Sequence, residues 1–387
     1  MGHVGWVTII GGVLMLLSGA GAVYMLAVAV VLHRFFAKTV AAPARGDAVT
    51  LLKPLYGAEP RLAANLATFL VQHHAGPVQL LCGVQRPDDP AITAVESLCA
   101  AHPGDDITLI RDPTAHGASG KISNLVNMDA HARHDIVILS DSDIAVAPDY
   151  LARVLAALDE PGVGAVTCLY RGRGDAGFWS RVAAAGLSWQ FLPGAVFGVA
   201  LGLAKPCMGS TIAMRRETLD AIGGFVRFAD VLADDHAIGA AVEALGLRVA
   251  VPPMLVTHAS AEIGFVAMWR HELRWGATVR GLVHPAAYSA SVIGFPLPIA
   301  LLALPFTPFP ALGLAAFALL ARLAVALTAD RIAGARPASY LLLPIRDCLS
   351  FAIFIASFCV RSVDWRGERL TMTSGGRIRA APEIPDS

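Results

Sequence analysis

The feature that most constrains this chain is an apolar run at its start. Residues 1–33 contain no Asp, Glu, Lys or Arg, and residues 7–32 are almost continuously apolar. About 20 apolar residues span the hydrocarbon core of a bilayer, whereas a signal peptide needs a basic start and a shorter apolar core. The run therefore predicts an N-terminal transmembrane helix over 1–33. Arg34 and Lys38 follow at once, so the positive-inside rule places the N-terminus outside and the following chain in the cytoplasm.

A second long apolar region lies in the last third of the chain. Residues 281–321 carry no charged side chain, and prolines interrupt the region near residue 308. The span is too long for one crossing, so we expect a helical hairpin over 288–306 and 309–328 with the prolines at its turn. Arg322, near the end of the hairpin, is expected to extend its side chain towards the membrane interface.

The stretch 340–360 is the ambiguous part of the C-terminal region. It has the length to cross, but Arg346 and Asp347 lie in its middle, and charges there usually face a partner or a cavity. Length favours a full crossing, while a re-entrant segment stays open because it would keep the basic tail inside. The C-terminal membrane region is placed at 287–362, with two or three helices, and a polar tail at 363–387.

Composition excludes two broad classes of protein. Only 16% of the residues are charged and 55% are hydrophobic, whereas ordinary soluble domains carry about 25% charged residues. This argues against a purely soluble protein. The 30 basic residues are balanced by 30 acidic ones, so nothing in the net charge supports nucleic-acid binding.

The middle of the chain, 34–286, has the pattern of a cytoplasmic α/β domain. Short β-branched runs alternate with helix-like stretches, which favours a mostly parallel sheet with helices on both faces. The runs are 49–52, 78–84, 107–110, 136–140, 163–167 and 249–251, and the helical stretches are 63–73, 91–100 and 150–158. Ligands of such sheets bind beyond the carboxyl ends of the strands. The apolar stretch 178–204 fits either a buried core or an interfacial segment.

The strongest local signal follows the run 136–140, where Asp141 and Asp143 are separated by Ser142. In extended backbone, residues i and i+2 point to the same side, so both carboxylates can face one ligand. Mg²⁺ or Mn²⁺ held by a few carboxylates keeps positions open for phosphate oxygens, so the pattern predicts a metal–diphosphate site. A turn that merely ends the strand is the structural alternative, because Asp and Ser favour turns.

Two further acidic pairs accompany this motif. Asp88 and Asp89 follow the run 78–84, again at the end of a strand. Asp234 and Asp235 precede a helix-like stretch. A carboxylate there is either a helix cap or a general base that the helix dipole keeps ionised.

A basic and aromatic motif precedes the second membrane region. Arg274 and Trp275 suit a diphosphate partner and a stacking surface, but they equally suit an anchor at the membrane interface. His258 is isolated in the sequence, and we expect it in the core or at the surface rather than on a metal.

Together these motifs resemble the inverting GT-A glycosyltransferases of family 2 and its ceramide-glucosyltransferase-like branch, family 21. Several strings are similar to those of bacterial hopanoid-biosynthesis glycosyltransferases, which attach N-acetylglucosamine to a bacteriohopane polyol. The strings are LKPLYG at 52–57, DDPAI at 88–92, GKISNL at 120–125, LADDH at 232–236 and VDWRG at 363–367. The resemblance covers residues 50 to about 367. It implies a Rossmann-like GT-A domain flanked by transmembrane helices in the bacterial inner membrane.

The resemblance also implies a role for individual residues. Asp88 and Asp89 would approach the uridine, and Pro54 and Lys121 would lie near the nucleotide. Asp141 would hold the nucleotide sugar, Asp143 would ligate Mg²⁺ or Mn²⁺, and Asp235 would be the general base. Arg274 and Trp275 would close over the diphosphate and the acceptor. His271 stands where the wider family has Gln or Arg, which puts processive polysaccharide synthesis in doubt.

The implied reaction is transfer of N-acetylglucosamine or glucose, with inversion, from a UDP-sugar to a hydroxyl of a membrane lipid such as a bacteriohopane polyol. The implied partners are the donor, the lipid acceptor and the bilayer. Ceramide glucosyltransferase is one alternative. A polyprenyl-phosphate sugar transferase is another, because Arg215 and Arg216 could bind a phosphate. A transporter or nucleotide-sensing scaffold would need paired repeats with polar or broken helices. Only the charged residues Arg346 and Asp347 point to such a helix.

Overall fold

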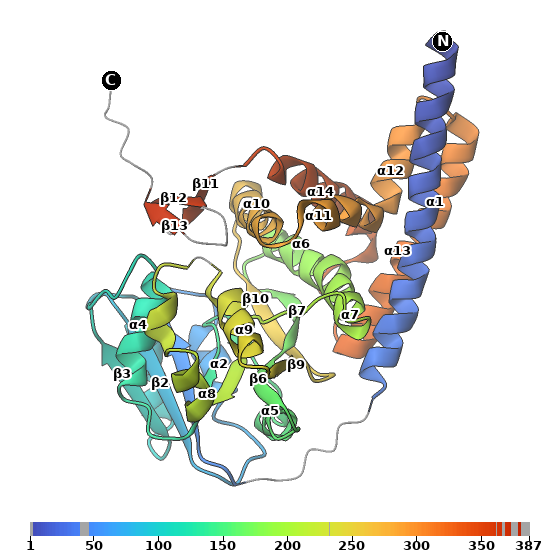
Figure 1. Cartoon of the computed structure of the whole chain (residues 1–387). Helices are drawn as coiled ribbons and strands as arrows, with labels where there is room; N and C mark the ends of the chain where they lie inside the picture. The colour runs from blue at the N-terminus through green and yellow to red at the C-terminus, as the bar shows by residue number, and fades with distance from the viewer. Residues whose placement is uncertain are drawn as a thin grey trace, which may run out of the picture. The chain divides into compact units, whose positions relative to one another are not determined.

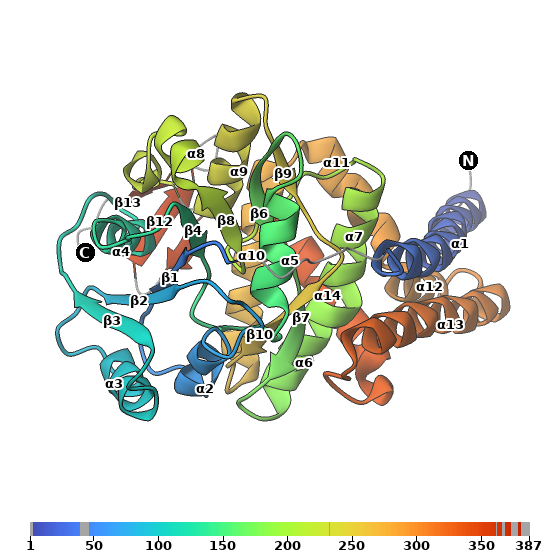
Figure 2. The ribbon, with the colours of Figure 1, turned by 90° about the horizontal axis from the view of Figure 1, so that it is seen from below.

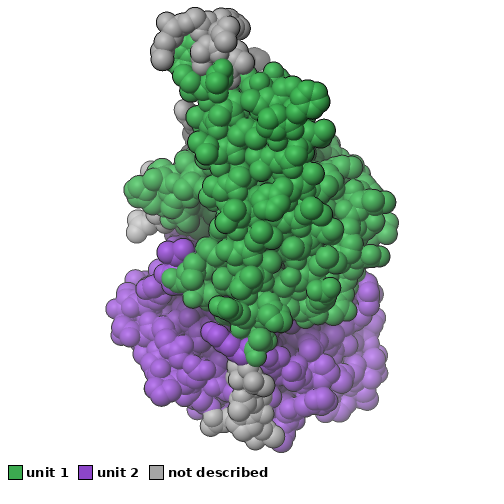
Figure 3. All heavy atoms as spheres, turned by 90° about the vertical axis from the view of Figure 1, so that its right-hand side faces the viewer, with its two compact units in different colours: residues 1–37, 172–201, 262–363 green, residues 38–171, 202–261, 364–387 purple. Residues whose placement is uncertain are grey.

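The computed structural model describes residues 3–38, 46–231, 233–360, 362–365, 368–372 and 378–380. Most of the predicted tail, residue 232 of the LADDH string and residues 366–367 of VDWRG lie outside the described residues. The chain divides into two compact units, coloured separately in Figure 3. Unit 1 contains residues 1–37, 172–201 and 262–363, and unit 2 contains residues 38–171, 202–261 and 364–387.

Unit 2 is built on a main sheet of seven strands in the order β3-β2-β1-β4-β8-β6-β9, seen in Figure 2. The strands are β1 Val49–Pro54, β2 Val78–Val84, β3 Asp106–Arg111, β4 Ile136–Leu139, β6 Val163–Thr167, β8 Ile212–Arg215 and β9 Arg248–Ala250. β1 pairs in parallel with β2 and β4, as do β2 with β3 and β6 with β9. The predicted mostly parallel sheet is confirmed. The sequence did not indicate β8, which runs antiparallel to β4 and β6.

Unit 2 contains the helices α2 Leu62–Ala67, α3 Ala91–Ala101, α4 Gly120–Asp129, α5 Tyr150–Leu158, α8 Arg216–Ala221 and α9 Asp234–Ala244. Apolar residues of α4, α8 and α9 form one buried core with strands of the main sheet. Leu125 of α4, Ile238 of α9 and Val137 of β4 are all buried in this core. The expected helix over 63–73 is shorter than predicted, because α2 ends at Ala67 and turns follow it.

A smaller sheet in the order β5-β10-β7 lies beside the predicted metal site. Its strands are β5 Ile144–Ala145, β10 Leu255–Ser260 and β7 Leu169–Gly174. β5 continues directly from Asp143 and pairs antiparallel with β10, so that Ile144 faces His258. A third sheet contains β11 Ser362–Trp365, β12 Glu368–Met372 and β13 Ile378–Ala380.

Unit 1 is helical, and its apolar helices pack on one another (Figure 1). The helix α1 His3–Phe36 contacts α12 Pro296–Ala303, α13 Pro308–Ala333 and α7 Leu192–Ala200. Among the described residues, four helices are long and apolar enough to cross a membrane: Thr8–Phe36, Phe178–Ala200, Pro308–Ala333 and Tyr340–Ser357. The second of these contains α6 Phe178–Gly186, a π-helical turn Leu187–Phe191, and α7.

The first arm of the expected hairpin is not one straight helix. Residues 288–306 are divided among α11 Pro285–Ala290, a 3₁₀ turn Ser291–Gly294 and α12, and the chain bends by 75° between the turn and α12. Pro296 opens α12, and a proline at that position cannot continue a preceding helix because it lacks a backbone N–H. The second arm, expected over 309–328, is α13, which begins one residue earlier, at Pro308, and extends to Ala333.

Arg322 on α13 does not extend to an interface, as the sequence had suggested. Its side chain is 1% exposed. Its Nε and Nη2 atoms donate to the two carboxylate oxygens of Asp347 at 2.9 and 2.8 Å. Asp347 lies on α14 Leu343–Ser357, and its neighbour Arg346 donates to Glu272 of α10 Phe265–Leu282 at 2.9 Å. The expectation that the charges of 340–360 face partners is confirmed.

Candidate active site

An acidic cluster surrounds one lysine at the carboxyl end of β4. Lys121 is the second residue of α4, and its Nζ lies 2.7 Å from Oδ1 of Asp141 and 3.2 Å from Oδ2 of Asp234. Burial opposes the charged form of Lys121, but these carboxylates outweigh it and hold the pKa of the ammonium well above its usual value. Burial also raises the pKa of Asp141. The cluster therefore has more carboxylates than cations.

Asp235 completes the cluster at the N-terminus of α9. Its Oδ2 accepts a hydrogen bond from the Gly209 backbone N–H at 3.2 Å, and its Oδ1 accepts one from the His236 N–H at 2.7 Å. Burial, and next the charge of Asp234, raise the pKa of Asp235 to about 6. The carboxylate is thus mostly ionised at neutral pH yet basic enough to accept a proton, which is the property that a general base needs.

Gly209 lets two parts of the cluster approach closely. Its backbone carbonyl accepts a hydrogen bond from Asp141 N–H at 3.0 Å, while its own N–H holds Asp235. A Cβ atom at residue 209 would lie 2.5 Å from Oδ2 of Asp141 and 3.0 Å from Nζ of Lys121. Any side chain at residue 209 would therefore displace the cluster.

Asp143 and His258 form the second part of the site. Oδ2 of Asp143 lies 3.1 Å from Nε2 of His258. The β5–β10 pairing brings them together, since Ala259 N–H also donates to the Asp143 carbonyl at 2.8 Å. His258 is buried, as expected for a core residue, but its position beside Asp143 was not foreseen. No sequence pattern near His258 indicates this contact, because it depends on strand register.

The donor set of this pair fits a divalent cation. A carboxylate oxygen and an imidazole nitrogen suit Mn²⁺, and Mg²⁺ prefers oxygen ligands. Within the described ranges, no three or more His, Cys, Asp or Glu side chains form a group that could hold a metal. A cation at Asp143 and His258 would therefore need diphosphate oxygens and water to complete its coordination.

Glu59 is a further acidic residue that the sequence did not single out. It follows β1, and its Oε1 accepts a hydrogen bond from Oγ of Ser142 at 2.6 Å. Burial, and next the charge of Asp143, raise the pKa of Glu59 to about 7. Glu59 thus fixes the position of Ser142, which lies between Asp141 and Asp143.

Pro54, predicted near the nucleotide, and Asp88 and Asp89, predicted at the uridine, lie at or after the ends of β1 and β2 at the same edge of the sheet. Pro54 ends β1 opposite Gly83 of β2. Asp89 is buried, and its Oδ1 accepts hydrogen bonds from Gly57 N–H and Ala91 N–H, both at 2.9 Å. Asp88 is exposed, and a hydrogen bond from Arg86 lowers its pKa. The predicted contact with uridine stays a prediction.

Arg274 and Trp275 lie on α10 in unit 1. His271 on the same helix contacts Glu262, with 2.6 Å between Nδ1 and Oε1, and its ring meets Trp275 edge-on at 4.8 Å between centroids. The acidic cluster belongs to unit 2. The role predicted for Arg274 and Trp275 over the diphosphate therefore stays a prediction.

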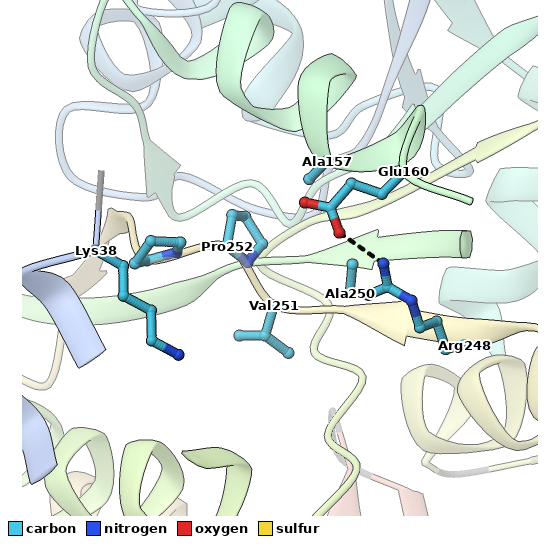
Figure 4. A pocket seen from close by; sticks show the side chains of 8 residues that line it. Lys38, Ala157, Glu160, Arg248, Ala250, Val251 and Pro252 are labelled. Atoms are coloured by element: carbon cyan, nitrogen blue, oxygen red, sulfur yellow. Dashed lines mark hydrogen bonds and ion pairs between the residues drawn. The ribbon is translucent and has the colours of Figure 1, made fainter. Parts of the chain in front are cut away.

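Two other features of unit 2 lie apart from the cluster. Arg215 and Arg216, named above as possible phosphate ligands, pair with Asp159 and Asp129. Arg215 faces Ile136 at the start of β4, whereas Asp141 follows the end of that strand. Figure 4 shows a pocket that contains none of the predicted site residues. Its lining residues are Lys38, Ala157, Glu160, Arg248, Ala250, Val251, Pro252 and Pro253.

Comparison with known proteins gives a family match over most of the chain. The model described as Glycosyl transferase family 21 matches residues 13–378. Ceramide glucosyltransferase 1 of Caenorhabditis elegans is 26% identical over 233 residues, which is 59% of this chain and 48% of that protein. Ceramide glucosyltransferase 3 of the same organism is 25% identical over 242 residues, 59% of this chain and 49% of that protein. The chain thus matches about half the length of these relatives.

A solved structure shares the fold. Mannosyltransferase PcManGT from Pyrobaculum calidifontis, in complex with GDP-Man and Mn²⁺, has a TM-score of 0.50 and 22% identity. The match covers 91% of this chain and 99% of that one. Together with the mostly parallel sheet, this likeness confirms the predicted GT-A fold.

Proposed function

Because the chain belongs to glycosyl transferase family 21, we propose that it transfers a sugar from a nucleotide-sugar donor, UDP-glucose or UDP-N-acetylglucosamine, to a hydroxyl of a membrane lipid. The observation that carries the proposal is the acidic cluster: Asp141, Asp234 and Asp235 surround Lys121 at the carboxyl end of β4. This is the edge at which open α/β sheets bind their ligands.

The donor is proposed to bind through its diphosphate. Asp143 and His258 would hold Mn²⁺ or Mg²⁺ there. The use of a divalent cation is supported by the mannosyltransferase of the same fold, which was solved with GDP-Man and Mn²⁺. A bound cation supplies positive charge that stabilises the departing diphosphate. Asp141 contacts Lys121 at 2.7 Å, so the pair is proposed to orient the nucleotide sugar beside this cation site.

Asp235 is proposed to remove the proton from the acceptor. The acceptor oxygen forms a bond to the anomeric carbon while the bond from that carbon to the diphosphate oxygen breaks. The electron pair leaves with UDP, and the hydroxyl proton moves to Asp235. One displacement inverts the anomeric carbon. Because the pKa of Asp235 is about 6, the carboxylate is available for this step at neutral pH.

The helices of unit 1 favour a lipid as the acceptor, since four of the described helices are long and apolar enough to cross a membrane. Basic residues after α1 support a cytoplasmic active site on the bacterial inner membrane. The curated relatives named ceramide glucosyltransferases favour ceramide, and the sequence strings favour a bacteriohopane polyol. A polyprenyl phosphate is less favoured, because Arg215 and Arg216 are paired with carboxylates at the opposite edge of the sheet.

The test uses the full-length protein in lipid nanodiscs with MnCl₂. UDP-glucose or UDP-N-acetylglucosamine is combined with ceramide or a bacteriohopane polyol, and glycolipid is measured by mass spectrometry. We expect product with one donor–acceptor pair and a loss of about 10²- to 10⁴-fold in Asp235→Asn, with UDP binding retained. Wild-type turnover by Asp235→Asn would refute the base assignment. UDP release without glycolipid would refute a lipid acceptor.

A further inference from the structure

Lys53 is a buried cation at the end of β1 whose role the proposed reaction leaves open. It has no exposed surface. Its Nζ donates hydrogen bonds to Oγ of Ser140 and to the backbone carbonyl of Asp141, both at 2.9 Å. It also lies 3.6 Å from the centroid of the Phe69 ring. Two hydrogen bonds and one aromatic face thus surround the ammonium group.

If only the stability of the fold mattered, burying this lysine would be unfavourable. An ammonium group loses its hydration on burial, and this loss lowers the pKa of Lys53 to about 7. The neighbouring residues Leu51 and Leu52 are apolar and fully buried, as expected in a central strand. The hydrogen bonds of Lys53 go to a hydroxyl and a backbone carbonyl, whereas Lys121 makes ion pairs with carboxylates. A buried central strand favours apolar side chains, so a lysine at this position indicates a functional requirement.

The two residues that accept hydrogen bonds from Lys53 connect the two halves of the active site. Ser140 Oγ, which accepts from Lys53, donates to the Ser210 carbonyl at 2.8 Å. Asp141, whose carbonyl accepts from Lys53, donates its N–H to the Gly209 carbonyl at 3.0 Å. Gly209 N–H in turn holds Asp235 at 3.2 Å. The ammonium group therefore holds residues 140 and 141, and hydrogen bonds from these two residues reach the turn 208–210.

We propose that Lys53 is a positioning residue, which fixes the segment 140–143 against the turn 208–210 and so sets the diphosphate-binding carboxylates relative to the general base. This inference rests on the proposed function. Lys53 acts through Ser140 and Asp141 and need not touch the substrate. Residues that orient metal and diphosphate ligands in this way affect binding strongly, although they lie behind the ligands.

The test measures binding of UDP to the full-length protein in detergent with MnCl₂, by isothermal titration calorimetry. Lys53→Met keeps the length of the side chain but removes the ammonium, and we expect UDP to bind about 10- to 100-fold more weakly. Ser140→Ala removes one acceptor with little change in volume, and it should weaken binding in the same direction. The loss in the double variant should be smaller than the product of the two single losses, because either change alone already breaks the hydrogen bond from Lys53 to Ser140.

Thr50→Val provides the matched control. Thr50 lies on the same strand, near its other end, and its hydroxyl donates to Oε1 of Gln79 at 2.8 Å. This variant also loses a buried hydrogen bond, but we expect UDP binding within about twofold of wild type because the change is distant from the site. Thermal unfolding of all variants, in the same detergent, shows whether weaker binding follows lost stability.

Two results would overturn the inference. One is UDP binding by both Lys53→Met and Ser140→Ala that equals that of the wild type. The other is a loss in Thr50→Val as large as the loss in Lys53→Met, which would mean that any damage to β1 suffices. If wild-type protein itself fails to bind UDP with MnCl₂, the proposed function fails and this inference fails with it. In lipid nanodiscs, kcat of Lys53→Met should also fall while KM for the lipid stays unchanged.

Discussion

Both units bury charged side chains, but they do so in different ways. In unit 1, Arg322 is matched by one carboxylate, Asp347, through two hydrogen bonds of 2.9 and 2.8 Å. In unit 2, Lys121 contacts both Asp141 and Asp234, and Asp235 lies in the same cluster. The pair in unit 1 is balanced, whereas the cluster in unit 2 carries surplus negative charge.

The difference indicates which buried charges hold the fold and which await a ligand. A balanced, bidentate pair has its charge neutralised within the protein. Burial raises the pKa of Asp141, and burial and next the charge of Asp234 raise the pKa of Asp235. Perturbed pKa values of this kind concentrate at functional sites. A divalent cation, or a proton taken from an acceptor, would relieve the surplus negative charge in unit 2.

The largest effect on stability is expected in unit 1. Arg322→Met leaves Asp347 buried without its cation, and breaking a buried pair in this way costs about 3–5 kcal/mol. Thermal unfolding of the full-length protein in detergent measures the loss. The variant that also carries Asp347→Leu should recover most of it, because both charges are then gone. If Arg322→Met alone unfolds like the wild type, the pair is not structural.

The second prediction concerns the cation. Chelation by EDTA should abolish sugar transfer, and added MnCl₂ should restore it. Asp143→Asn and His258→Gln should each raise the Mn²⁺ concentration for half-maximal activity by about tenfold or more. Neither should lower the unfolding temperature as Arg322→Met does. Full activity in EDTA would show that Asp143 and His258 do not hold a required metal.

The third prediction concerns pH. The pKa of Asp235 is raised to about 6, so the carboxyl group is protonated below that pH and cannot accept the acceptor's proton. We expect kcat/KM to fall about tenfold for each pH unit below 6. The charge of Asp234 contributes to the raised pKa, so Asp234→Asn should move this limb to lower pH. A limb that stays in place in Asp234→Asn would contradict the coupling between the two aspartates.

The smallest effect is expected at an exposed pair. Glu160 and Arg248 lie 2.6 Å apart, each about half exposed, beside the pocket of Figure 4. Exposed ion pairs contribute about 0–1 kcal/mol to stability. Glu160→Gln should therefore change the unfolding free energy by less than about 1 kcal/mol and leave sugar transfer unaltered. If Glu160→Gln lost as much stability as Arg322→Met, burial would not explain why one ion pair contributes more than the other.

The sequence alone determined the parts of this protein that depend on local patterns. The long apolar run became α1, and six of the seven strands of the main sheet followed from short β-branched runs in the sequence, whereas β8 was not indicated. The position of Asp141 followed from the end of β4, since a carboxylate there must emerge at the ligand-binding edge. Asp235 followed in the same way from the start of α9.

Tertiary structure decided what depends on contacts between distant residues. Register between β5 and β10 placed His258 beside Asp143, and helix packing matched Arg322 with Asp347. Lys53 could be noticed as a charge within an apolar strand, but its contact with Ser140 appears only when β1 and β4 lie side by side. A local pattern fixes where a side chain stands on its own element. Only packing fixes which charge or donor it meets, because that depends on how elements far apart in the chain are paired.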